Sequence, residues 1–219
     1  MLLSLALAPW LGPASALAVS SPALALGHLH RVHVYRPLID REIALRFAKA
    51  AGPAAVVGGL LAAWVPEWLL ALALLGGASL AVLQALGKIP SELGRRGLSW
   101  GAAGVGFLAA SCGGGGVLLP PTLMSAGLRG RAFVANAACG ALVVQCMRIV
   151  TYASAGLMAS WQLPLILAAG LGLPLGNLLG RRLAVHLDER RTQWATLMTL
   201  AIAVALGLLS FAKQVVDSL

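Results

Sequence analysis

The sequence predicts an all-α polytopic membrane protein with about six transmembrane helices and one glycine-broken re-entrant hairpin. Of its 219 residues, 59% are hydrophobic and 11% are charged, against about 25% charged in soluble domains, and the mean hydropathy is +0.88. The apolar runs lack the strict alternation that a membrane β-barrel needs. The net charge of +9 comes from arginines and lysines gathered between these runs, as the positive-inside rule predicts.

The first half of the chain holds three expected crossings, at residues 2–27, 43–65 and 68–86. The first of these is interrupted by prolines, and we expect it to cross the membrane once because it exceeds the roughly 20 residues that a crossing needs. A strongly basic loop, 28–49, follows it, and a second basic loop, 87–97, ends this half.

The uncharged segment from Leu98 to Leu128 opens the second half. It is longer than one crossing needs, and it is broken by four glycines, Gly113–Gly116, and then by Pro120 and Pro121. Four consecutive glycines do not hold a helix, and the prolines do not continue one. Irregular backbone at membrane depth is tolerated inside protein or beside a water-filled cavity, and transporters place such breaks at their substrate sites.

Three further crossings complete the second half, at 132–157, 162–180 and 192–212. The basic loops 28–49, 87–97, 129–131 and 181–191 hold every lysine and arginine except Arg148 and Lys213. These loops all face the cytoplasm if the glycine-broken segment enters the membrane and returns on the same side. A single crossing would instead put one of them outside, against the positive-inside rule. We therefore predict a re-entrant hairpin that turns near Gly113–Gly116, and an external C-terminus.

A weak internal repeat divides the chain into 1–97 and 98–219. When the halves are overlaid, Ala18-Val19-Ser20 falls on Val134-Ala135-Asn136, and Gly52-Pro53 falls near Gly172-Leu173-Pro174. Each half carries three crossings, an odd number, so the two repeats are inverted, as in many transporters. The counterpart of the glycine hairpin would fall just before Met1, so we expect the first repeat to be N-terminally incomplete or to have lost this element.

These features resemble those of the sulfite exporter TauE/SafE family of bacterial membrane transporters. Cys112–Leu123 resembles the glycine-rich, proline-followed segment that opens each half in that family, and Ala135-Asn136-Ala137 lies where the family has a small residue followed by Thr or Asn and Ser. The helix end and turn of the family are matched by Tyr152, Gly156 and Trp161. The resemblance implies a multi-pass transporter of the bacterial inner membrane that moves small sulfur anions, such as sulfite or sulfonates.

The candidate substrate-binding residues lie at the glycine break and on the helix after it: Gly113, Gly114, Gly115, Gly116, Pro120, Asn136, Gln145 and Arg148. A half-helix that begins after the glycines would direct N–H groups at an anion, and glycine lets a ligand approach the backbone. The alternative is that the glycines serve close helix packing or form a hinge.

Arg148 is the only full charge that lies inside an expected crossing and outside the basic loops, and intramembrane ionisable residues are functional candidates by default. Gln145 lies three residues before it on a similar helix face. The alternative for Arg148 is snorkelling toward the outer helix end. Asn136 is expected to bind substrate or hydrogen-bond the broken backbone, and the alternative is that it bridges two helices.

Other motifs favour structural roles. Gly172, Gly176 and Gly180 share one helix face, and we expect them to pack another helix of the same chain closely. His28, His30 and His33 are expected in a solvated basic loop rather than a metal site, because Asp40 is the only nearby acid. The arginine pairs at 181–182 and 190–191 are expected to set the topology and to contact anionic membrane lipids.

The sequence argues against several functional classes. The aromatic content of 5% gives no stacking surface for nucleic acid, and Cys112, Cys139 and Cys146 form no CxxC motif. No GxSxG, HExxH or Walker motif occurs, so we expect no enzyme, no cofactor and a transport driven by a gradient. An intramembrane hydrolase using Ser111 lacks a histidine at membrane depth. The main alternative is a non-transporting or partner-dependent membrane protein, and the sequence is compatible with a homo-oligomer.

Overall fold

The computed structural model of the chain describes residues 2–86, 97–184 and 189–217. These residues are almost entirely helical, and no strand occurs among them, which confirms the all-α prediction. Four described helices are long and apolar enough to cross a membrane: α3 (Arg41–Trp64), α4 (Glu67–Ala85), α7 (Gly130–Ser154) and α9 (Glu189–Asp217). The chain is therefore a multi-pass membrane protein. Most of the predicted loop 87–97 lies outside the described residues, as does part of the loop 181–191.

The N-terminal segment folds back on itself. α1 (Leu2–Leu11) ends at Gly12, whose φ of 80° lies in the left-handed region that glycine adopts at little steric cost. α2 (Pro13–Tyr35) starts at once with proline, a favoured first helical residue. The hydroxyls of Ser4 and Ser20 lie 2.9 Å apart, which requires α1 and α2 to run antiparallel. The expected single crossing over 2–27 is therefore wrong, because the Gly-Pro pair reverses the chain.

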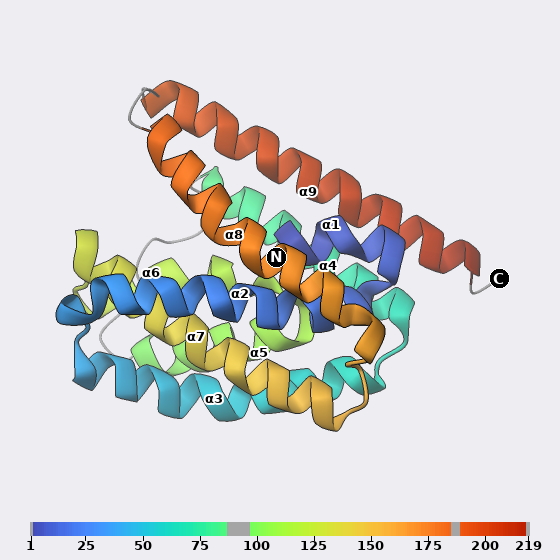
Figure 1. Ribbon diagram of the computed structural model, residues 1–219, viewed down its shortest axis with the longest axis horizontal. Coiled ribbons are helices and arrows are strands. Elements are labelled where there is room, and N and C mark those ends of the chain that lie inside the picture. Colours follow the sequence, from blue (N-terminus) through green and yellow to red (C-terminus); the bar gives the residue numbers. More distant parts are fainter. Residues whose placement is uncertain (1, 87–96, 185–188, 218–219) are drawn as a thin grey trace.

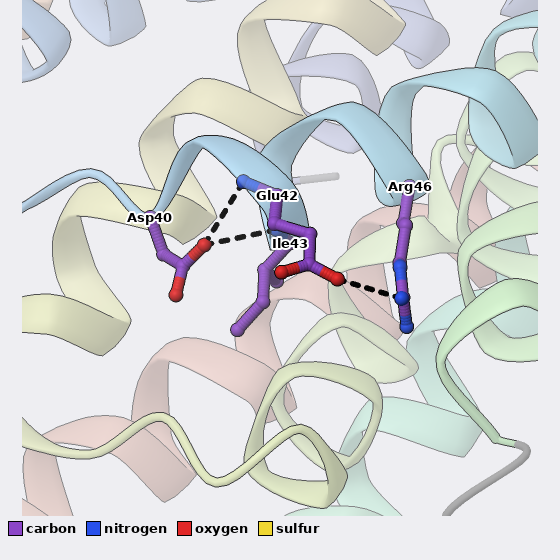
Figure 2. A network of polar contacts seen from close by, with 4 residues as sticks. All are labelled: Asp40, Glu42, Ile43 and Arg46. Atoms are coloured by element: carbon purple, nitrogen blue, oxygen red, sulfur yellow. Dashed lines mark hydrogen bonds and ion pairs between the residues drawn. The ribbon is translucent and has the colours of Figure 1, made fainter.

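A polar network fixes the corner between α2 and α3 (Figure 2). After the short helix η1 (Arg36–Leu38), Asp40 caps α3 by accepting bonds from the backbone N–H groups of Glu42 and Ile43 at 3.0 and 3.1 Å. Glu42 then forms an ion pair of 2.6 Å with Arg46, one turn further along α3. Both charged side chains are largely exposed, so the pair stabilises the helix by only about 0.3–0.5 kcal/mol.

Helices α3 and α5 (Gly97–Cys112) approach each other through glycine. A Cβ atom on Gly58 would lie 2.5 Å from the carbonyl oxygen of Phe107, and one on Gly106 would lie 2.1 Å from that of Ala51. Any larger residue would strike the neighbouring backbone, so these positions allow the close packing that membrane helices use. This contact holds α5 along α3.

The glycine-broken segment forms a re-entrant hairpin. α5 ends at Cys112, Gly113 turns with a φ of 68°, and the 3-10 helix η2 (Gly114–Val117) leads into α6 (Leu119–Ser125), which runs back. The start of α5 and the end of α6 line one cavity together with the start of α3, so both limbs of the hairpin reach the same end of the molecule. We call this end, which also carries the α2–α3 corner, the basic end; it lies on the left in Figure 1.

The turns between α3 and α4 and between α7 and α8 lie at the opposite end (Figure 1). The second turn contains the short helix η3 (Ser160–Gln162), and α8 (Leu163–Ala184) follows it. At this end Lys213 of α9 donates a hydrogen bond of 3.0 Å to the carbonyl oxygen of Pro9 in α1. That oxygen has no helical donor, because Pro13, four residues on, lacks an N–H group.

The glycine face of α8 does not pack within the chain as predicted. A Cβ atom on Gly172 or Gly176 would meet nothing within 4 Å, and the surroundings of Gly180 are not described. The glycine that packs is Gly170, where a Cβ atom would lie 2.7 Å from Leu26 of α2. Since consecutive helical residues are about 100° apart, Gly172 is turned away from α2 when Gly170 faces it.

The helix contacts recur between the halves. α3 packs on α7, and α8 packs on α2, while α4 contacts η2, and α9 contacts α1. The repeat predicts that α2 corresponds to α7, α3 to α8 and α4 to α9. The contact of α3 with α7 is then the counterpart of the contact of α8 with α2. The division at residue 97 stays a prediction.

Candidate functional site

Arg148 lies on α7 in the interior of the helix bundle, with 1% of its surface exposed. Its guanidinium donates three hydrogen bonds: Nη1 to Gln145 Oε1 at 2.9 Å, Nη2 to the carbonyl oxygen of Leu17 at 3.3 Å, and Nε to the hydroxyl of Tyr152 at 3.4 Å. The guanidinium carbon also lies 5.4 Å from the centroid of the Tyr152 ring. The side chain therefore points into the protein and does not snorkel to a helix end.

No acidic side chain pairs with Arg148 within the described part of the chain. Its three partners are an amide, a carbonyl and a hydroxyl, which are all neutral. The ion pair that the described residues do form joins Arg46 to Glu42 at the surface. A lone cation at the centre of a bilayer costs about 2.5–3.5 kcal/mol on insertion scales, and such residues mark substrate or ion pathways. The site thus holds one uncompensated positive charge.

The start of α1 and the glycine break meet beside Arg148. A Cβ atom on Gly113 would lie 3.7 Å from Ser4 Oγ and 3.4 Å from a side-chain carbon of Leu17. Ser4 contacts Ser20, which donates at 3.0 Å to the Leu17 carbonyl that also binds Arg148. All these side chains are fully buried or nearly so. A chain of hydrogen bonds therefore runs from Ser4, which lies next to the break, to the carbonyl that binds the guanidinium.

Tyr152 connects Arg148 to the last turn of α5. Its hydroxyl accepts the bond from Arg148 and donates to the carbonyl oxygen of Ala110. The final carbonyls of a helix lack helical donors, and a buried one needs another partner. Because Tyr152 is fully buried, this bond couples α7 to the limb that leads into the break.

Two of the four glycines lie in close packing contacts. A Cβ atom on Gly115 would lie 2.4 Å from the carbonyl oxygen of Val105, so the turn folds directly onto α5. One on Gly114 would lie 3.3 Å from the Cα atom of Gly77, so α4 also approaches the break closely. Gly113 is the glycine that faces Ser4.

The half-helix after the break supplies few N–H donors. α6 has seven residues, and Pro120 and Pro121 in its first turn have no N–H group. The carbonyl of Val117, just before this turn, accepts a bond of 2.6 Å from Gln84 of α4. The arrangement therefore gives no support to the predicted anion contact with this helix start. The positive charge at the centre comes from Arg148 instead.

The structure brings three predicted site residues together, Gly113, Gln145 and Arg148. The others lie apart from this cluster: Gly114 and Gly115 are buried in packing contacts, Gly116 is exposed, and Pro120 is half-buried in α6.

Asn136 also lies away from the cluster. It precedes Arg148 by twelve residues on α7, which is about 18 Å along the helix axis. Its Nδ2 donates to the carbonyl of Ala132 in its own helix and not to the hairpin backbone, as had been expected. Its Oδ1 is buried without a hydrogen-bond partner, an arrangement that is uncommon in proteins.

Part of the site comes from α1 and α2 and was not predicted from the sequence, namely Ser4, Ser20 and the Leu17 carbonyl. Two signals for it are present in the sequence. The dipeptide Gly12-Pro13 is typical of a turn, and a turn there brings residue 4 back to residue 20. The repeat also places Ser20 on Asn136, which was itself a site candidate.

This arrangement is suited to binding an anion. Guanidinium offers a planar set of N–H donors that matches an oxyanion, and here it is already desolvated. Neutral hydroxyls and an amide surround it, and they add hydrogen bonds without cancelling the charge. Among the described residues, its hydrogen-bond partners are Gln145, Tyr152 and the Leu17 carbonyl.

A sequence model of the family described as Sulfite exporter TauE/SafE matches residues 1–208. The match includes α1, the glycine hairpin and Arg148, and it extends into α9. No curated protein and no solved structure matches the chain.

Proposed function

The chain belongs to the sulfite exporter TauE/SafE family, and we propose that it is a secondary transporter of small sulfur oxyanions in the bacterial inner membrane. Sulfite and sulfonates are the proposed substrates, and the direction that the family description gives is export. Movement is driven by a gradient, since the sequence has no Walker motif for nucleotide hydrolysis.

One observation carries this proposal, the buried and unpaired charge of Arg148 next to the glycine break. A pair of a guanidinium with an oxyanion is ionised on both sides and is frequently bidentate, which makes it stronger than a bond from the guanidinium to a neutral acceptor. An oxyanion therefore competes well with the neutral groups that Arg148 now contacts. Its arrival also removes the cost of a lone charge in the membrane.

Transport further requires that the site open to each side in turn. Arg148 is closed off in this structure, and the chain reversal at Gly113 lies against Leu17, whose carbonyl binds Arg148. Transporters with inverted repeats bind substrate at the repeat interface and rock one repeat against the other. We assign the same alternating access to this chain, with α1–α2 on one side of the anion and the α5–α6 hairpin on the other.

The test is the flux of labelled sulfite in vesicles that contain the purified chain, measured as uptake and as efflux. Sulfate and a sulfonate serve as anion comparators, and a labelled organic cation serves as the control for leakage. We expect saturable sulfite flux that protein-free vesicles lack and no flux of the cation. Absence of flux for all three anions in both directions would contradict the proposal and favour a non-transporting or partner-dependent membrane protein.

A further inference from the structure

A cavity of about 690 Å³ lies at the basic end, at the mouth of the hairpin. The first two turns of α3, the first turn of α5 and the end of α6 line it, and its wall includes Arg46, Ser99, Trp100 and Ser125. α5 is 16 residues long, about 24 Å, so this cavity is a helix length from the tip of the hairpin beside Arg148. It is therefore separate from the central site.

The charges around this cavity favour an anion. Arg46 lines it directly, and its partner Glu42 lies on the same helix with a side chain that is 72% exposed. A second guanidinium, that of Arg129, donates to the carbonyls of Met124 and Leu128 at 2.8 and 3.0 Å, at the end of α6. Arg46 thus lines the cavity, and Arg129 lies at the end of α6. Glu42, the acid that pairs with Arg46, is on the surface. An exposed pair of this kind is weak, so a stronger anionic ligand replaces it at little cost.

We propose that this cavity is a second anion-binding site, in which a sulfur oxyanion replaces Glu42 as the partner of Arg46. The Ser99 hydroxyl and the Arg46 guanidinium supply the donors, and Trp100 forms part of the wall. The inference rests on the proposed function, because it makes this cavity the place where the anion waits at the basic end before it passes to Arg148. Glu42 acts as a competing internal anion that keeps the site weak enough to release its ligand.

Trp100 allows binding to be measured without transport. Purified full-length chain, in detergent free of phospholipid, is titrated with sulfite at constant ionic strength while tryptophan fluorescence is recorded. We expect a saturable change that Trp100→Phe abolishes. We expect Arg46→Gln to weaken the apparent affinity roughly threefold to tenfold and Glu42→Gln to strengthen it. The matched control is Arg131→Gln, an exposed arginine at the same end that does not line the cavity, and it should titrate like wild type.

This proposal would be overturned by an Arg46→Gln variant that titrates like wild type, or by a sulfite signal that persists in Trp100→Phe. The same titration in discs of anionic phospholipid separates a free anion from a lipid headgroup. A signal retained there supports the free anion, and a signal lost there assigns the cavity to lipid and overturns the proposal.

Arg148→Gln should abolish flux and keep the Trp100 signal. A wild-type chain that shows the signal without flux would therefore count against transport and not against this site.

Discussion

At the scale of the residue, the burial of the Arg148 charge is explained better by the binding of an anionic ligand than by a contribution to the stability of the fold. Its bonds to Gln145 and Tyr152 lie within α7, so only the bond to the Leu17 carbonyl joins two helices, and such bonds average about 0.6 kcal/mol in measured cases. A lone arginine at membrane depth costs about 2.5–3.5 kcal/mol. The single bond between helices does not offset this cost, and none of the three neutral partners compensates the charge. A ligand of opposite charge supplies the missing compensation.

Tyr152 gives a prediction at the same scale. Tyr152→Phe removes the hydroxyl that joins Arg148 to the Ala110 carbonyl, and it leaves two buried polar groups without that partner. We expect a loss of about 1–3 kcal/mol of unfolding free energy and a reduced flux. Thermal unfolding in detergent and sulfite flux are the measurements. Tyr35→Phe, at the less buried end of α2, is the control, and equal effects of the two substitutions would speak against a specific role of Tyr152.

At the scale of the element, the hairpin is held by contacts so close that they leave little room for a side chain at its glycines. Gly115 lies against α5, Gly114 lies against α4, and Gln84 of α4 satisfies the carbonyl of Val117. Irregular backbone in a membrane needs such partners, because no water satisfies it there. The break is therefore a packed structure that presents one face, at Gly113, to the Arg148 cluster.

Two adjacent glycines of this break are predicted to respond differently. A Cβ atom on Gly115 would strike Val105 and Ala109, whereas one on Gly116 would meet nothing within 4 Å. We expect Gly115→Ala to cost about 1–3 kcal/mol through overpacking and Gly116→Ala to change stability by at most about 0.5 kcal/mol. Gly115→Leu should abolish flux in a protein that still inserts into the membrane. Sulfite flux and membrane yield are compared for each variant, and normal flux in Gly115→Leu would contradict this account of the break.

Elements also show what the sequence can predict. The hairpin over 98–128 was predictable, because glycine and proline break helices locally and the basic loops report sidedness over short distances. The reversal at Gly12 was not recognised, since the run 2–27 satisfies the length and hydropathy of one crossing. The glycine face of α8 was assigned a partner wrongly, because spacing shows which residues share a face but not which helix that face meets.

At the scale of the whole molecule, the site depends on contacts between distant segments. Gln145 and Arg148 were predictable as a pair, since both lie on one helix and one of them is the charge inside it. Ser4, Leu17 and Ala110 belong to other elements, and their place beside Arg148 follows from how α1, α2 and α5 pack around α7. Such meetings depend on tertiary packing, which hydropathy and spacing do not encode.

The whole molecule places two positive centres along one proposed route, Arg46 at the mouth of the hairpin and Arg148 at its tip. The two differ in a way that suits their proposed roles. Arg46 is exposed and paired with an acid, which favours rapid exchange, whereas Arg148 is buried and unpaired, which favours selective binding. The proposed transport depends on the claim that the charge of Arg148 binds the anion.

The most direct test of that claim is sulfite flux through Arg148→Gln and Arg148→Lys, compared with wild type and with Arg131→Gln. Gln keeps polar hydrogen bonding and removes the charge, while Lys keeps the charge and loses the planar set of donors. We predict at least a hundredfold loss of flux for Arg148→Gln, which corresponds to about the 3 kcal/mol that a charged hydrogen bond contributes. We predict partial flux for Arg148→Lys and unchanged flux for Arg131→Gln. Each variant must elute as a single species with wild-type helical content. Wild-type flux through correctly folded Arg148→Gln would contradict the account.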